Sequence, residues 1–157
     1  MTTWNEAGGD IDELWGYTLQ DLYDEMSAWG QDEAGRCTWH PELNLAWDDN
    51  QIVTGGTLTV DLEVLTPAWA KRSDANDAVR AEWDRWSSAL MTHEMGHYDL
   101  AKQYLDNFED TLVGQSQTDA WAAFEKVKLD LQQASDNYDT STQHGITQGT
   151  TLDTSIT

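Results

Sequence analysis

The chain has 157 residues and carries 29 acidic side chains against eight basic ones, for a formal net charge of −21 at pH 7. This length suits a single domain with its own core, and the charge repels nucleic acid and anionic membrane surfaces. No apolar run approaches the roughly 18 residues of a membrane-spanning helix, so membrane insertion is not expected. The first residues lack a basic region followed by an apolar segment, so no signal peptide is predicted there.

The N-terminal part of the chain shows one helical pattern. Residues 1–13 are acidic and contain glycines, and we expect a loose segment there. Leu14–Leu19 is a candidate for a short strand. Apolar side chains then recur at helical spacing, which predicts a helix over 19–29 with Thr18 as its N-cap and Gly30 as its stop.

The next part of the chain alternates apolar and polar residues with a period of two, which is typical of strands. The alternation begins at Cys37 and runs to Trp47, and Pro41 within it favours an edge position. The single cysteine cannot form an internal disulfide, and we interpret it as a buried structural thiol. Gly55-Gly56 predicts a turn, Leu58–Val64 is the clearest strand, and Pro67 would close it. Short connections predict a small antiparallel sheet.

Two long helices are predicted in the second half of the chain. Ser73–Asp77 offers N-cap residues, and apolar spacings of three and four continue to about Val113, where Gly114 would end the helix. A second helix follows from Trp121 to Tyr138, and the short connection predicts that the two helices pack antiparallel. Residues 146–157 are expected to form a flexible tail.

The first long helix contains His93, Glu94 and His97 in the pattern His-Glu-x-x-His. Residues four apart lie on one face of a helix, so both imidazoles can reach one Zn²⁺. Glu94 lies about 100° around the helix, where it can border the metal site as general base for a water molecule. Because Gly96 has no side chain, a neighbouring segment can approach these ligands closely.

A catalytic zinc usually takes three protein ligands, so a third is needed. The returning second helix would bring His144 back to the level of His97, which makes it the preferred candidate. His40 lies on the polar face of its strand and is more simply an exposed histidine. Asp139 is the best carboxylate alternative, although we expect it to orient a histidine. Tyr138, and less so Tyr98, is a candidate donor to a developing oxyanion.

The motif and the downstream segment Tyr138–Gly145 (Tyr-Asp-Thr-Ser-Thr-Gln-His-Gly) together resemble the bacterial family of predicted secreted zinc-dependent proteases. The resemblance covers residues 14–148. It implies a zincin-like α+β fold, peptide hydrolysis and a secreted or periplasmic location. It also implies His144 as a residue of the metal site.

The sequence therefore predicts an α+β, zincin-like metallopeptidase domain over residues 14–145, with Zn²⁺ as cofactor and a peptide or protein as substrate. A monomer is the default. The strand Leu58–Val64 is a candidate edge for binding an extended peptide. Two alternatives remain open. One is a zinc-stabilised binding domain without catalysis, and the other is an acidic decoy that binds a basic partner through its charge.

Overall fold

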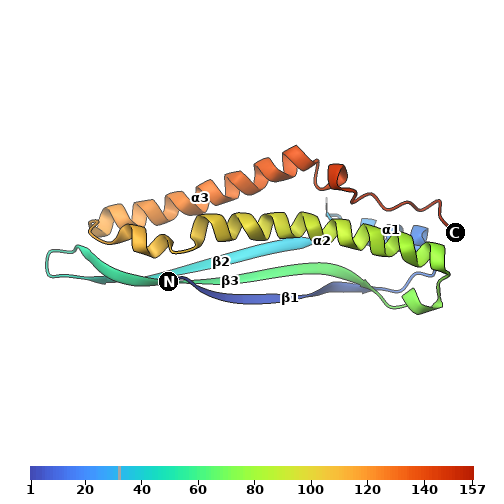
Figure 1. Cartoon of the computed structure of the whole chain (residues 1–157), viewed down its shortest axis with the longest axis horizontal. Coiled ribbons are helices and arrows are strands. Elements are labelled where there is room, and N and C mark those ends of the chain that lie inside the picture. Colours follow the sequence, from blue (N-terminus) through green and yellow to red (C-terminus); the bar gives the residue numbers. More distant parts are fainter. Residues whose placement is uncertain (32) are drawn as a thin grey trace.

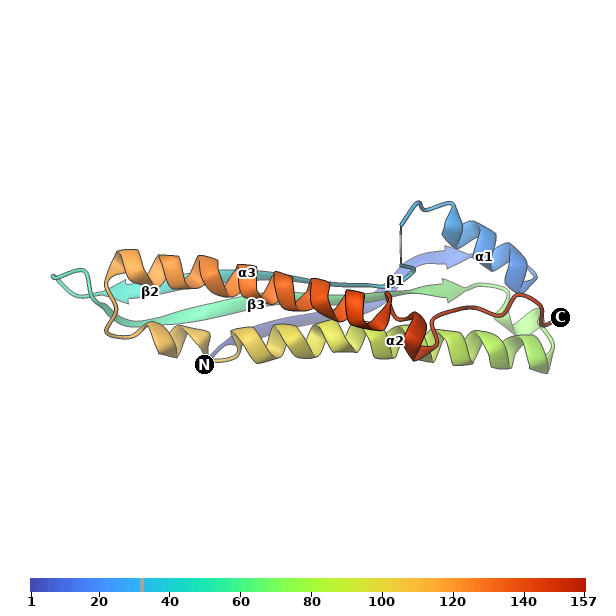
Figure 2. The same cartoon turned by 90° about the horizontal axis from the view of Figure 1, so that it is seen from above.

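The computed structural model describes residues 1–31 and 33–157 and has an elongated α+β architecture in two layers. A three-stranded sheet forms one layer, and the long helices α2 (Asp77–Leu105) and α3 (Gln117–Thr142) run along one of its faces (Figure 1). The short helix α1 (Leu19–Ser27) lies beside the end of the sheet (Figure 2). The predicted α+β class is confirmed.

The sheet has the strand order β1-β3-β2, with β1 spanning Thr3–Leu14, β2 Arg36–Trp47 and β3 Val53–Trp69. β2 and β3 form an antiparallel hairpin, whereas β1 pairs with β3 in parallel. The sheet is therefore mixed, and the prediction of a purely antiparallel sheet is wrong. Parallel strands need a long connection between them, and α1 and β2 together form that connection between β1 and β3.

The N-terminal segment is not loose, because residues 3–14 form the edge strand β1. Most of its side chains are exposed, and Gly8-Gly9 interrupts any alternation. Backbone pairing with distant β3 holds the strand, so local sequence carries no signal for it. The candidate strand at Leu14–Leu19 is also wrong, since β1 ends at Leu14 and α1 begins at Leu19.

The central strand β3 is longer than its sequence pattern indicates. Gly55-Gly56 is not a turn but belongs to the strand, where a Cβ on Gly56 would lie 2.6 Å from the Leu45 side chain of β2. Pro67 does not end the strand either. It falls where β1 shifts register between Asp10 and Glu13, so its missing N–H removes no bond from a regular ladder. Pro41 does lie in an edge strand, β2, as predicted.

α1 and α2 begin at the predicted caps, whereas α3 begins at Gln117, four residues before the predicted start. The Thr18 side chain accepts a hydrogen bond from the N–H of Asp21, whose carboxylate accepts in turn from the N–H of Thr18. Asn76 caps α2 in the same way through the N–H of Val79. α2 ends at Leu105 rather than near Val113, because Asp106 is extended with ψ 121° and Asn107 is left-handed with φ 58°. A separate 3₁₀ turn, Phe108–Leu112, follows before α3.

Two apolar cores lie under α2, one toward each end of the molecule. The first core joins the sheet to α3 and the C-terminal part of α2, and the second joins α1, the end of the sheet and the N-terminal part of α2. The first core contains Leu43, Val53, Leu58, Val60, Leu62, Ala101, Leu105, Leu112, Ala120, Phe124, Val127 and Leu131. The second contains Leu14, Leu19, Leu22, Met26, Trp69, Val79, Trp83, Trp86, Leu90 and Leu152. His93, Glu94 and His97 lie on α2 between them.

The C-terminal segment is docked on α2 and is not a free tail. The guanidinium of Arg85 donates to the carbonyl oxygens of Gly149 and Thr151 at 2.8 and 2.7 Å, and the indole of Trp86 donates to that of Thr150 at 2.8 Å. The side chain of Leu152 is buried in the second core. Among the described helices, none is both long and apolar enough to cross a membrane.

Candidate metal centre

The motif forms one buried turn of α2. His93 and Glu94 are 0% and 1% exposed, and His97 is 5% exposed. The Nε2 atoms of the two imidazoles lie 3.3 Å apart, so both rings point at the same place, as the four-residue spacing predicts.

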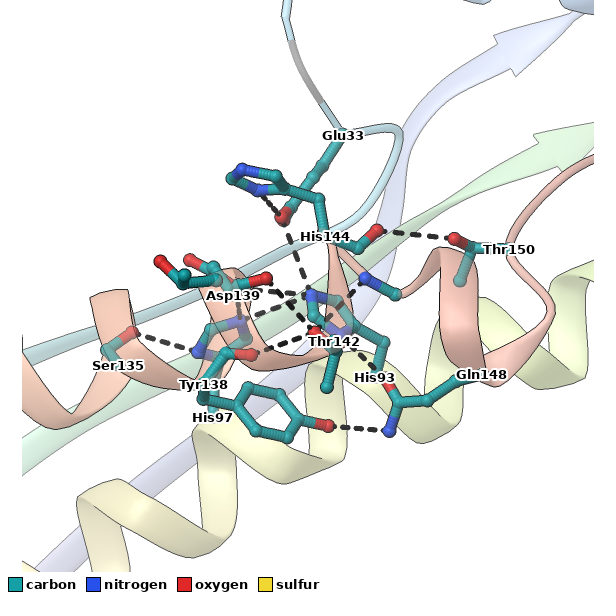
Figure 3. Close-up of polar contacts among 12 residues, drawn as sticks. Glu33, His93, His97, Ser135, Tyr138, Asp139, Thr142, His144, Gln148 and Thr150 are labelled. Carbon is teal, nitrogen blue, oxygen red and sulfur yellow. Dashed lines mark hydrogen bonds and ion pairs between the residues drawn. The ribbon is translucent and has the colours of Figure 1, made fainter.

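Two carboxylates from other parts of the chain complete a four-residue cluster with these histidines. Glu33 comes from the segment before β2, and Asp139 comes from the last turns of α3. One donor atom from each of Glu33, His93, His97 and Asp139 lies within 4.8 Å of the others (Figure 3). Oδ1 of Asp139 is 2.8 Å from Nε2 of His97, and Oε1 of Glu33 is 3.5 Å from Nε2 of His93.

The histidines are oriented by hydrogen bonds at their other ring nitrogens. Nδ1 of His93 donates to Oε1 of Gln148 at 2.9 Å, so the neutral imidazole has the lone pair of Nε2 facing the cluster. Nδ1 of His97 lies 2.9 Å from Oγ of the buried Ser135 on α3. With Nδ1 protonated, His97 likewise presents an Nε2 lone pair. Such partners at the far nitrogen are typical of metal-binding histidines.

The ring of Tyr138 packs against both imidazoles. It stacks on His93 with ring centroids 5.1 Å apart and meets His97 edge-on at 4.9 Å. Gly96 allows this approach, because a Cβ there would lie 2.1 Å from Oη of Tyr138. The prediction that Gly96 lets a neighbouring segment reach the ligands is confirmed. Oη of Tyr138 accepts a hydrogen bond from Nε2 of Gln148 at 2.9 Å, so this hydroxyl is part of the support of His93.

The donor set of the cluster fits a divalent cation. Two imidazole lone pairs and two carboxylates converge, and no donor within the described residues hydrogen-bonds Oδ1 of Asp139. Burial raises the pKa of Asp139 and lowers that of His97, so both groups are held in a place that disfavours their charged forms. A bound cation would relieve both costs. The cluster can therefore hold a metal ion, and nitrogen and oxygen donors of this kind suit zinc.

The general-base candidate Glu94 borders this cluster in an unusual environment. Burial, assisted by the negative charge of Glu33, raises its pKa to about 7. Its Oε1 has no hydrogen-bond partner among the described residues, and Gly35 passes so close that a Cβ there would lie 2.3 Å from this oxygen. A carboxylate with a pKa near neutrality can both take up and release a proton at that pH.

A cavity of about 300 Å³ opens beside the cluster, and we call it the strand cavity. It lies between β2 and the two long helices, with Glu94, His97 and Asp139 on one side and Gly35, Thr38 and Trp39 on the other. Cys37 also lines it, and burial raises the pKa of this thiol to about 12. The thiol is therefore protonated at neutral pH and is not a nucleophile there, which agrees with a structural role.

The remaining candidates lie outside the four-residue cluster. His144 is adjacent to it but half-exposed, and its Nδ1 pairs with Oε1 of Glu33 at 2.6 Å (Figure 3). The cluster around the two histidines consists of Glu33 and Asp139 rather than His144, so the role of His144 as third ligand stays a prediction. His40 is exposed on β2 opposite Asp61. Tyr98 donates to Glu6 at 3.1 Å, on the side of α2 that faces β1.

Sequence reasoning missed three contributors: Glu33, Ser135 and Gln148. Glu33 lies in a segment without periodicity, and only the packing of that segment against α2 brings it to the histidines. Ser135 looks like an ordinary polar residue of α3, although it lies one helical turn before Asp139 on the same face. Gln148 belongs to the stretch interpreted as a tail.

The fold and the cluster define an α+β protein with a His/carboxylate site able to hold a metal ion. Residues 13–145 match the model of a family described as "Bacterial protein of unknown function (DUF922)". The chain therefore belongs to this bacterial family. No match is found among curated proteins or solved structures.

Proposed function

We propose that this protein is a zinc-dependent peptidase in which His93, His97 and Asp139 hold the metal and Glu94 is the general base. The observation that carries the proposal is the convergence of two imidazole lone pairs and Asp139 next to a buried carboxylate with a pKa near neutrality. When bound, a metal of this kind polarises a carbonyl group and acidifies a water molecule. Export, which the family resemblance implies, remains part of this proposal.

Glu94 has two tasks in the proposed reaction. Its ionised carboxylate accepts a proton from the attacking water, and its protonated form then gives that proton to the departing amine. Burial keeps both forms accessible near neutral pH, since the charged form lacks full hydration. Because Gly35 has no side chain, it leaves space beside Oε1 of Glu94. No described residue donates a hydrogen bond to this oxygen, so it is free to accept one from the water.

The substrate would lie along the free edge of β2. β3 cannot serve, because it pairs with β1 on one side and β2 on the other, and the prediction that its edge binds a peptide is wrong. β2 is an edge strand, and Gly35, Thr38 and Trp39 line the strand cavity next to the cluster. An extended peptide added there would be held by main-chain hydrogen bonds.

The substitution Glu94→Gln tests the function. We expect peptide hydrolysis to fall by about 10²- to 10⁴-fold, because the amide cannot act as a base. Zinc content and melting temperature should be retained, since Gln has nearly the same shape. Purified parent and variant would be compared by metal analysis, thermal unfolding and cleavage of an unstructured protein. Equal cleavage by both proteins would overturn the role of Glu94, and an inactive zinc-loaded parent would overturn the peptidase.

The position of Glu33 favours a second candidate, a zinc-stabilised binding domain. With Glu33 counted, the cluster offers four protein donors, which is the closed arrangement of a structural zinc site. Glu33→Gln separates the two functions. A peptidase should keep its zinc and its hydrolysis, because a catalytic site leaves one position open. A structural site should lose both zinc affinity and melting temperature.

A further inference from the structure

A second cavity, of about 400 Å³, lies on the other side of Glu33, and we call it the helix cavity. It is bounded by α1, the N-terminal half of α2 and the docked C-terminal segment. Its apolar wall is made by Met26, Trp86, Leu90 and Leu152 of the second core. Ser27 and Gln31 are exposed at its rim.

The helix cavity borders the candidate site through one shared residue. Glu33 lines both cavities, and His144, its partner at 2.6 Å, lines the helix cavity. The metal cluster therefore lies between two cavities of different character. The strand cavity borders the carboxylates and the polar edge of β2, whereas the helix cavity reaches the apolar second core.

We propose that the helix cavity binds a bulky apolar side chain of the peptide substrate, next to the bond that is cut. This inference rests on the proposed peptidase function and names its substrate class. A peptide held along β2 has to pass the Glu33–His144 pair to continue beyond the cluster. The first side chain beyond that pair meets the wall formed by Met26 and Leu90, where an apolar group is removed from water.

The selectivity can be measured with peptides that differ at one position. The series is acetylated and amidated, contains only Ala and Gly elsewhere, and carries Phe, Leu, Asp or Gly at its central residue. We expect the zinc-loaded protein to cleave the Phe and Leu peptides with a kcat/KM about 10- to 100-fold above that of the Gly peptide, from burial of one side chain. The Asp peptide should be the poorest.

Ser27→Trp provides the structural test, because the indole would fill the mouth of the helix cavity from an exposed position at the end of α1. The matched control is Gln20→Trp, on an exposed position of α1 outside the cavity. We expect Ser27→Trp to abolish the preference for Phe and Leu, so that the Phe, Leu and Gly peptides are cleaved with similar kcat/KM. Gln20→Trp should behave as the parent.

Binding of the same peptides to the metal-free protein, measured by calorimetry, gives a readout that does not need catalysis. The Phe peptide should bind at least 10-fold more tightly than the Gly peptide, and Ser27→Trp should remove this difference. Peptide selectivity in binding without hydrolysis would refute the peptidase but support the cavity. Hydrolysis with equal rates and affinities for all four peptides would support the peptidase and overturn the inference.

Discussion

The side-chain oxygen of Gln148 lies 2.9 Å from Nδ1 of His93, although 55 positions separate the two residues. The nitrogen of the same amide donates to Oη of Tyr138, whose ring stacks on His93. One residue of the C-terminal segment thus fixes both the tautomer and the tilt of a proposed metal ligand. Docking of this segment and formation of the site are therefore one structural event.

Gln148→Leu should weaken zinc binding by about 10- to 100-fold, the usual effect of removing a partner of a metal-binding histidine. Leu keeps the bulk but cannot accept the proton of Nδ1, so His93 is free to turn away. Competition with a chromophoric chelator measures the affinity. Tyr138→Phe is the control, since it removes only the hydroxyl that accepts from Gln148 and should lower the zinc affinity much less. Equal losses in both variants would contradict the orienting role of the amide.

The ligand set can be separated by two substitutions near the end of α3. Asp139→Asn should lower zinc affinity by at least 10-fold, because it removes the carboxylate 2.8 Å from His97 Nε2. His144→Ala should retain one zinc per chain, because this imidazole contacts the cluster only through Glu33. Metal analysis after dialysis gives the stoichiometry. Loss of zinc from His144→Ala, with retention by Asp139→Asn, would restore His144 as third ligand.

Gly96→Ala should destabilise the protein by about 1 to 3 kcal/mol, the usual cost of overpacking. Helix propensity alone predicts a gain of about 1 kcal/mol, so the sign of the change decides between propensity and packing. The cost arises because the new Cβ would overlap Tyr138. In a Tyr138→Ala background the same substitution should become stabilising. Urea unfolding of all four proteins closes the cycle.

Arg85→Ala should release the C-terminal segment, since it removes the donors to the carbonyls of Gly149 and Thr151. It also leaves the buried carboxylate of Glu82 without its cation. Faster limited proteolysis after residue 148 would report the release. Arg72→Ala removes an exposed ion pair with Asp84 and should change little, so it serves as control.

Low pH should also weaken the docking of the C-terminal segment on α2, because Glu82 binds this segment through its ionised carboxylate. Hydrogen bonds from Arg85 lower the pKa of this carboxyl against the opposing effect of burial, and the N–H of Asp153 adds to them. A lowered pKa in the folded state stabilises the protein above the unfolded value near 4.5, and this contribution disappears as the pH falls through the folded value. The protection factor of the Asp153 amide in hydrogen exchange should therefore fall below pH 4.5, and it should fall less in Glu82→Gln.

The features that could be predicted from the sequence are those encoded by neighbouring residues of a single element. The capping box at Thr18, the apolar spacing of α2 and the paired imidazoles of His93 and His97 are local patterns, and the structure contains all three. The approach of a segment to Gly96 also followed from the residue itself.

The failures share a different cause, namely partners far apart in the chain. β1 is a strand because it pairs with β3, and its own side chains show no alternation. Glu33 joins the histidines only through packing, and Gln148 does so from a segment that looked unstructured. The end of α2 depends on the backbone conformations of Asp106 and Asn107, which apolar periodicity does not detect.

Helix α2 runs from one apolar core to the other, and the imidazoles and carboxylates occupy the level between them. At that level α2 buries His93, Glu94 and His97 in place of apolar side chains, so apolar packing between the helices and the sheet contributes less there. A divalent ion bound by the four-residue cluster would also tie α3 and the segment before β2 to the middle of α2. Removing such an ion would loosen the middle of the molecule first, while the apolar core at each end would keep its packing.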